Sequence, residues 1–185
     1  LRPPTYAGPA LYFNYAKMPA IAPKAVRQAI AHAIKREIGA AAALGESAEP
    51  PKYMAGFSDR LVSKWMTPEA IGKLNKYEYN LAGAEALMTG AGYKKGSDGV
   101  WVSPDGERME YEVTVPAEFA DNSALAQAVA EQLTAFGIKT TVRLITFTQL
   151  TPDTQAGNFQ MVIQGWGSGN PHPHFAFVAD LVRSE

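Results

Sequence analysis

The side chains best suited to chemistry lie close together near the end of the sequence, in residues 159–175, which read FQMVIQGWGSGNPHPHF. His172 and His174 flank a proline, and proline favours an extended backbone around it. In an extended chain, residues i and i+2 point the same way, so both imidazoles could reach one metal ion. A metal site needs further ligands, and the nearby acid is Asp180 alone. We therefore predict no metal site and no cofactor here.

The same segment contains the residue types of a nucleophilic hydrolase. Ser168 and His172, with an aspartate from elsewhere, could form a Ser-His-Asp triad. The sequence around this serine is Gly-Ser-Gly, which lacks the Gly-x-Ser-x-Gly spacing of a nucleophile elbow. No nucleotide-binding glycine fingerprint follows a strand either. We predict no catalytic residue, and a metal-dependent or serine hydrolase that uses His172, His174 and Ser168 is the alternative of a different class.

Trp166 is the residue of this segment that suggests binding. The apolar run Phe159–Ile163, followed by Gly165-Trp166-Gly167 and then by Gly, Asn and Pro, predicts a buried strand that ends at a loop. Ligands of open α/β sheets bind outside the carboxyl ends of strands, so Trp166 is expected at a binding edge. The structural alternatives are a core tryptophan at the sheet edge, or an interaction domain in which it is buried. Trp65, in an apolar helical stripe, is assigned to the core.

Composition and charge restrict the class of protein. The 185 residues are 46% hydrophobic and 19% charged, as in an ordinary globular domain with one core or two very small ones. A formal net charge of -1 gives no support for binding to nucleic acid or to an anionic membrane. No apolar run approaches the ~20 residues of a membrane span. The start, LRPPTYAGPA, does not read as a signal peptide. The absence of cysteine excludes disulfides and thiolate catalysis.

Strands and helices are expected to alternate along much of the chain. Strands are predicted at Leu11–Tyr15, Glu110–Val115, Lys139–Thr146 and Phe159–Trp166, and helices at Pro23–Ile38, within Gly56–Thr67, between Asn80 and Gly92, and at Asn122–Phe136. The strand–helix–strand order of residues 110–146 predicts a parallel pair with a right-handed crossover. We therefore predict one α/β domain with helices packed on a mixed sheet.

Three connecting segments carry more specific predictions. Ala40–Pro51 is expected to be a frayed helix end followed by an irregular loop. Val100–Val102 is expected to pair with Glu110–Val115 as a hairpin around a Ser-Pro-Asp-Gly turn. Pro152 lies within Thr146–Gly157, which predicts one broken or short helical turn there.

Four segments, in this order, together resemble a known family. They are LYFNYAKMPAIAPKAVRQAIAHAIKRE, YEYNLAGAEALMTGAGYKKGSDGVWVSPDGERMEYEVTV, LAQAVAEQLTAFGIKTTVRLIT and GNFQMVIQGWG. They resemble, respectively, a strand with its VRQAI-type helix, a helix with a hairpin, a crossover, and a strand that ends in Gly-Trp. The family is that of the extracytoplasmic solute-binding proteins of ABC importers, specifically the dipeptide/oligopeptide-binding family (family 5).

The resemblance implies an architecture and a mode of action. In this family the matching segments form much of the second lobe of a two-lobed clamp. Residues 1–185 are therefore expected to be a single α/β lobe of a periplasmic-binding-protein type II-like clamp, without the first lobe and the secretion signal. The resemblance implies that the lobes close on a ligand by hinge motion, and that the closed form docks on the ABC permease in the membrane. It also implies an extracytoplasmic location, in the periplasm or lipid-anchored at the cell surface.

The resemblance further suggests which residues contact the ligand. Trp166 matches a tryptophan that faces the cleft between the lobes, so stacking on ligand is expected. The candidate ligand-binding residues are Gly165, Trp166, Gly167, Ser168, Asn170 and His172. Peptide-binding members place an aspartate just after this tryptophan, but here no acid occurs before Asp180, and a buried ammonium without a partner is costly. An aromatic platform with Ser, Asn and His suits a neutral carbohydrate. A short peptide and an oligosaccharide both remain as expected ligands.

Overall fold

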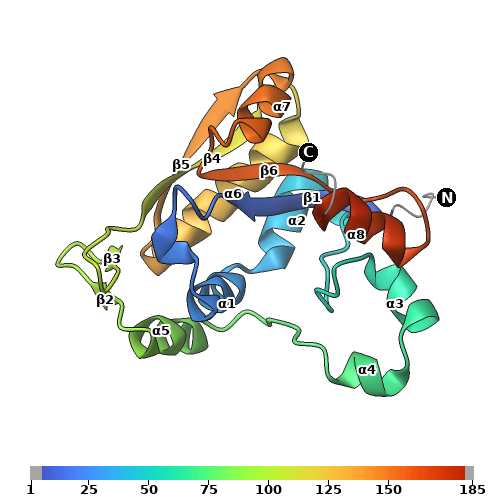
Figure 1. Cartoon of the computed structure of the whole chain (residues 1–185), viewed down its shortest axis with the longest axis horizontal. Coiled ribbons are helices and arrows are strands. Elements are labelled where there is room, and N and C mark those ends of the chain that lie inside the picture. Colours follow the sequence, from blue (N-terminus) through green and yellow to red (C-terminus); the bar gives the residue numbers. More distant parts are fainter. Residues whose placement is uncertain (1–5, 182–185) are drawn as a thin grey trace.

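A four-stranded mixed sheet organises the chain in the computed structural model, which describes residues 6–181. The strand order is β1-β6-β4-β5, in which β4 is parallel to both neighbours and β1 is antiparallel to β6 (Figure 1). The strands are β1 (Ala7–Phe13), β4 (Glu110–Pro116), β5 (Lys139–Ile145) and β6 (Met161–Gly167). The α/β class and the parallel pair predicted from the sequence are both confirmed.

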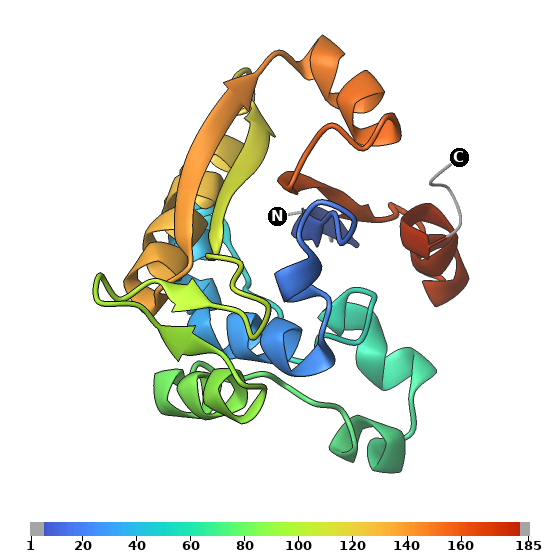
Figure 2. The ribbon, with the colours of Figure 1, turned by 60° about the vertical axis from the view of Figure 1, so that its left-hand side comes forward.

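The other elements of residues 6–181 are mostly helices. They are α1 (Lys24–Ala33), α2 (Arg36–Leu44), α3 (Asp59–Trp65), α4 (Pro68–Gly72), α5 (Leu81–Gly90), α6 (Ala120–Phe136), α7 (Phe147–Gln155) and α8 (Pro173–Leu181), with 3-10 turns at Pro19–Ile21 and Gly45–Ser47. Figure 2 shows α6 packed along β4 and β5, whereas α8 lies beside α3, away from α7. Within residues 6–181, no helix has the length and the apolar composition needed to cross a bilayer.

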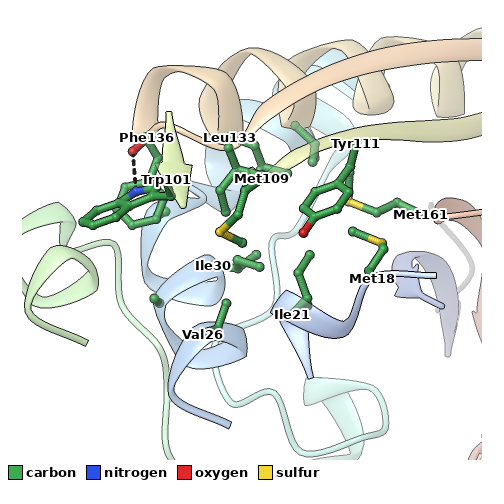
Figure 3. Packing of buried hydrophobic residues seen from close by; sticks show 14 of the residues in the cluster. Met18, Ile21, Val26, Ile30, Trp101, Met109, Tyr111, Leu133, Phe136 and Met161 are labelled. Atoms are coloured by element: carbon green, nitrogen blue, oxygen red, sulfur yellow. Dashed lines mark hydrogen bonds between the residues drawn. The ribbon is translucent and has the colours of Figure 1, made fainter. Parts of the chain in front are cut away.

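The main hydrophobic core lies between the sheet and helices α1, α5 and α6 (Figure 3). Val113 and Val115 of β4 are both buried in this core, in the alternation typical of a strand. Helix α6 contributes Val129, Leu133 and Phe136, which form the apolar face predicted from their spacing. Full burial of one such side chain contributes roughly 1.5–3 kcal/mol. The core therefore holds β4 and β6 firmly in place, and with them the end of the sheet that carries the candidate site.

The single helix predicted over Pro23–Ile38 is interrupted in the structure. Ile34 and Lys35 are extended, with ψ angles of 114° and 98°, so α1 and α2 are separate helices. A distant side chain bonds the backbone at this break, because the Oε1 of Gln132 accepts the N–H of Lys35 at 2.7 Å. A local helical pattern contains no information about such a partner, and the prediction was therefore wrong.

The predicted end of this helical region at Ile38 also needs correction, whereas the helix end followed by an irregular loop that was expected within Ala40–Pro51 is present. Helix α2 continues through Gly39 to Leu44, and a 3-10 turn follows before the chain becomes irregular. A Cβ at Gly39 would lie 2.7 Å from the Cδ1 of Leu125 in α6. The glycine therefore permits two helices to pack closely instead of ending one of them.

The predicted hairpin around the Ser-Pro-Asp-Gly turn forms, but its second arm is residues 107–109 and not Glu110–Val115. Val102 pairs with Arg108 in antiparallel fashion, and the N–H of Met109 donates to the carbonyl of Trp101 at 2.9 Å. A backbone hydrogen bond of 3.0 Å closes the Ser-Pro-Asp-Gly turn. The strand before the turn, β3 (Trp101–Val102), pairs with β2 (Lys94–Lys95) in a separate two-stranded sheet. β4 has β6 on one side and β5 on the other, so β4 cannot also pair with β3.

Thr146–Gly157 contains a helix of nine residues, α7, instead of the predicted broken or short turn. Pro152 lacks an N–H, but its carbonyl still accepts the N–H of Ala156 at 3.0 Å. At the other end of α7, the carboxylate of Glu118 accepts the N–H of Phe147 at 2.9 Å. The first bond satisfies a carbonyl at the C-terminal end of α7, and the second satisfies an N–H at its N-terminal end. Together they help to offset the backbone hydrogen bond that proline removes.

A second, smaller apolar cluster connects α3 and α8 with the end of β6. Its buried members come from α3, from the segment before it and from α8, and they are Phe57, Leu61, Val62 and Ala176. Trp166 packs against this cluster. The candidate site therefore lies where the main sheet meets the smaller cluster.

Candidate functional site

The Gly-Trp-Gly sequence lies inside strand β6, which extends one residue beyond the predicted strand end at Trp166. All three of its residues pair with the first residues of β1. β1 begins at Ala7, and not at the start of the predicted strand Leu11–Tyr15. β6 covers Met161–Gly167, close to the predicted Phe159–Trp166. The glycines extend a strand because a distant segment supplies its hydrogen-bonding partner, which a local pattern does not reveal.

The side chain of Trp166 is partly buried. One side of it packs against the smaller apolar cluster, which includes Leu61 of α3 and Ala176 of α8. It is therefore more enclosed than an open stacking platform and less enclosed than a core residue. Contact between Trp166 and a ligand stays a prediction.

Asp180, which lies in α8, reaches back to the end of β6. Its carboxylate accepts the N–H of Gly167, with N–O distances of 3.1 and 3.0 Å, and the hydroxyl of Tyr12 at 3.2 Å. Burial, followed by the charge of Asp180, raises the pKa of Tyr12 well above its ordinary value. Gly167 has a φ of 81°, and a Cβ there would lie 2.8 Å from the carbonyl oxygen of Tyr6. The acid nearest to Trp166 is thus already engaged within the chain.

A chain of short-range hydrogen bonds shapes the loop between β6 and α8. The N–H of Asn170 donates to the Oγ of Ser168 at 2.9 Å. The N–H of His172 donates to the Oδ1 of Asn170 at 3.1 Å. The structure therefore brings these predicted ligand-binding residues together on one loop, beside Trp166, and fixes its conformation.

The extended His172-Pro173-His174 segment predicted from the sequence is not found. Pro173 begins helix α8, a position that suits proline because the first N–H of a helix has no intrahelical partner. The N–H of His174 donates to the Nδ1 of His172 at 3.1 Å, and the two ring centroids lie 6.3 Å apart. Among residues 6–181, no group of three or more His, Cys, Asp or Glu side chains is arranged to hold a metal ion.

The geometry around Ser168 gives no support to a serine hydrolase. Its hydroxyl oxygen accepts a backbone N–H, and within the described chain it has no hydrogen bond to an imidazole. The Nδ1 of His172 accepts a backbone N–H, so it does not donate to a carboxylate as the Nδ1–H of a triad histidine does.

Trp65, which the sequence assigns to the core, is instead a surface residue of this site. Its side chain is 49% exposed, and its Nε1–H donates to the carbonyl of Pro171 at 3.0 Å. Its ring lies 4.3 Å from the ring of His172, centroid to centroid, at an angle of 62°. One signal in the sequence indicates this position: the residue before Pro68 is disfavoured in a helix, so Trp65 falls in the last turn, where no later turn covers it.

Two hollows in the described part of the chain lie away from the predicted residues. One, of about 470 Å³, is lined by His32 and residues 74–80, and the other, of about 560 Å³, lies between α6 and β5. Neither is lined by a predicted site residue, and both are wide open. We give more weight to the site at the end of β6, because its exposed rings and polar groups converge on one loop.

Solved structures with the same fold define the class of the protein. The oligopeptide-binding protein AppA of Bacillus subtilis, solved with a nonapeptide, is 23% identical with a TM-score of 0.75, over 89% of this chain and 32% of AppA. A periplasmic oligopeptide-binding protein of Thermotoga maritima, solved with mannohexaose, is 20% identical with a TM-score of 0.72, over 94% of this chain and 32% of that protein. The fold is that of type II periplasmic binding proteins, matched over part of their length.

The sequence matches the family of bacterial extracellular solute-binding proteins, family 5, middle region, over residues 1–182. The chain belongs to this family, as its sequence motifs indicate. A probable ABC transporter-binding protein of Deinococcus radiodurans is 30% identical over 155 residues, which are 80% of this chain and 25% of that relative. The chain thus spans between a quarter and about a third of the length of these proteins.

Proposed function

We propose that residues 1–185 form one α/β lobe of the substrate-binding component of an ABC-type importer, which captures a short peptide or an oligosaccharide for transport. The observation that carries this proposal is the family match over residues 1–182. The Deinococcus radiodurans relative, a probable ABC transporter-binding protein, supports the importer assignment. The chain's partners are then the other lobe of the same protein and the permease subunits in the membrane, and its location is extracytoplasmic.

The ligand contacts the end of β6 and the loop that follows it. Gly165, Trp166, Gly167, Ser168, Asn170 and His172 are the proposed ligand-binding residues. The exposure of Gly165, Asn170 and His172 supports the proposal, because one face of a clamp presents its ligand contacts on its surface. Closure of the other lobe over this face would exclude water and complete the contacts. Capture and release involve no covalent chemistry.

Two ligand classes are retained because related folds bind both. The Bacillus subtilis protein was solved with a nonapeptide and the Thermotoga maritima protein with mannohexaose. Both ligands are chains of repeating units with hydrogen-bonding groups along their length. A surface that combines aromatic rings with neutral polar side chains is compatible with either.

Calorimetric titration of the full-length protein tests this proposal. A pool of mixed tripeptides is titrated first, followed by cello-, xylo- and manno-oligosaccharides. We expect one class to release heat with a dissociation constant in the micromolar range or below, about -8 kcal/mol or stronger. Trp166→Ala should weaken that binding, and the ligand should be recovered unchanged. The absence of heat from every member of both panels, or turnover of the ligand, would contradict the proposal.

A further inference from the structure

Trp65 is unusual because its ring is half-exposed and yet fixed in orientation. It is the most exposed of the three tryptophans, all of which lie in the described part of the chain. The hydrogen bond from its Nε1–H to Pro171 ties the indole to the loop after β6. The edge contact with His172 holds it from a second direction, and aromatic pairs of this kind contribute about 0.5–1.5 kcal/mol. A ring held in this way loses little conformational entropy when a ligand stacks on it.

Further rings extend the surface of Trp65. The side chain of Phe175 is 48% exposed, and its centroid lies 6.4 Å from that of His172. The ring centroids of His174 and Phe175 lie 5.5 Å apart. Trp65, His172 and Phe175 therefore form a row of rings that comes from two helices, α3 and α8, and from the loop before α8. This row, which we call the aromatic row, is more accessible than Trp166.

The polar side chains of the loop that carries His172 are neutral. Residues 165–175 contain no Asp, Glu, Lys or Arg. Asp180, the nearest acid after them, is occupied by Gly167 and Tyr12. Because the Nδ1 of His172 accepts a backbone N–H, the neutral imidazole carries its proton on Nε2 and can donate from there. The hydroxyl of Ser168 and the side-chain amide of Asn170 add further neutral groups.

We infer that the aromatic row, with Trp65 as its main platform, binds the pyranose rings of a neutral oligosaccharide; this rests on the proposed function. A sugar ring offers an apolar C–H face for stacking and hydroxyls at its rim for Ser168, Asn170 and His172. A peptide amino terminus would bring an ammonium ion to a loop in which residues 165–175 include no acid and next to which Asp180 is already engaged, so its burial there would be costly. Trp65 is thus a specificity-determining residue.

The test uses the full-length protein and four variants, titrated with cellohexaose, mannohexaose and trialanine. Trp65→Ala removes the platform, Trp65→Phe retains a smaller ring, and His172→Ala removes the neighbouring ring. Phe147→Ala is the matched control, since Phe147 is 50% exposed and also has an edge-on aromatic partner, but lies on α7. Thermal unfolding and near-UV circular dichroism establish that each variant is folded.

We expect a hexaose to bind and Trp65→Ala to raise its dissociation constant about 10-fold or more, which corresponds to about 1.4 kcal/mol. Trp65→Phe should raise it by a smaller factor, and Phe147→Ala should leave it unchanged. Hexaose should also shift the tryptophan fluorescence of the wild type, and this shift should be clearly smaller in Trp65→Phe at saturating hexaose, where only the other tryptophans can report binding. A purely structural role of Trp65 would not produce that spectral loss.

The outcomes separate this inference from the proposed function. A hexaose that binds Trp65→Ala, Trp65→Phe and the wild type equally overturns the role of Trp65 and leaves the proposed function in place. Binding of trialanine without binding of either hexaose overturns the carbohydrate assignment, again without harm to the proposed function. If neither class binds the folded wild type, both are overturned.

Discussion

At the scale of the residue, Gly137 shows how one backbone conformation joins two parts of the fold. It ends α6 with a φ of 106°, in the left-handed region, and its N–H donates to the carbonyl of Leu133 at 3.1 Å. Its own carbonyl accepts the N–H of Trp101 at 2.8 Å, which attaches β3 to the end of the helix. A Cβ at this position would lie 2.5 Å from the carbonyl oxygen of Gly99. Only glycine satisfies both the dihedral angle and the contact.

Gly137→Ala should therefore destabilise the protein by about 1–3 kcal/mol, through backbone strain and the displaced Gly99. Urea unfolding followed by circular dichroism measures the change. Gly90→Ala is the matched control: Gly90 is helical, and a Cβ there would meet nothing within 4 Å. That variant should be neutral or more stable by up to about 1 kcal/mol. Equal effects of the two substitutions would contradict the role assigned to Gly137.

At the scale of the element, exposed ion pairs connect the β2–β3 turn to the main sheet. Arg108 lies 2.6 Å from a carboxylate oxygen of Asp98 and 2.6 Å from one of Glu110, and Lys139 of β5 pairs with Glu110 at 3.2 Å. The hydrogen bond from Arg108, together with the N–H of Val100, lowers the pKa of Asp98 from 3.8 to about 2. Hydrogen bonds from Arg108 and Lys139 also lower the pKa of Glu110. Each pair is solvent-exposed, so each contributes little by itself.

The depressed pKa of Asp98 sets the sign of a pH dependence. Its ion pair stabilises the folded state above pH 3.8, the ordinary pKa, and this contribution is lost as the pH falls towards about 2. The thermal unfolding midpoints of wild type and Asp98→Asn should therefore differ most above pH 4 and converge near pH 2. The difference should also shrink in 1 M NaCl, because salt screens exposed charges. A difference that is constant from pH 5 to pH 2 would show that the ion pair does not stabilise the turn.

At the scale of the whole molecule, the chain consists of a main core and a smaller apolar cluster that carries the candidate site. The smaller cluster includes α3 and α8, which lie next to each other in both views (Figures 1 and 2). Asp180 attaches α8 to the main sheet through Gly167 and Tyr12. Arg36 holds the segment before α5, since its guanidinium donates to the carbonyl of Tyr77 at 2.7 Å. A few polar contacts thus position the site against the sheet.

Asp180→Ala should loosen the smaller cluster without unfolding the main core. Removal of the carboxylate leaves the N–H of Gly167 and the hydroxyl of Tyr12 without this acceptor, so local opening should become easier. Hydrogen exchange followed by mass spectrometry should show faster exchange in peptides from α3 and α8, and unchanged exchange in α6. Tyr12→Phe removes only one of the two donors, and its effect should be smaller. A uniform increase along the whole chain would indicate global destabilisation and not a local tether.

The elements that the sequence determined by itself are those whose signals are local. The apolar face and the terminal glycine of α6 predict that helix, and the flanking β-branched strands predict the parallel pair. The N-cap of α5 is local as well, because the Oδ1 of Asn80 accepts the N–H of Gly83, three residues away, at 2.9 Å. Motifs spread over the chain were sufficient to identify the family. In each case the information lies within a few turns of one element, or in short segments in a fixed order.

Tertiary structure alone decided the features whose partners are distant in sequence. Gln132 satisfies the backbone where α1 and α2 separate, and β1 extends β6 through the Gly-Trp-Gly sequence. The candidate site follows the same rule. The sequence predicted the position of its loop, but it also predicted that Trp65 is buried in the core and that Trp166 is the exposed ring. The bond between Trp65 and Pro171 spans 106 residues, and burial depends on which surfaces such contacts bring together. Side-chain spacing along one helix carries no information about that.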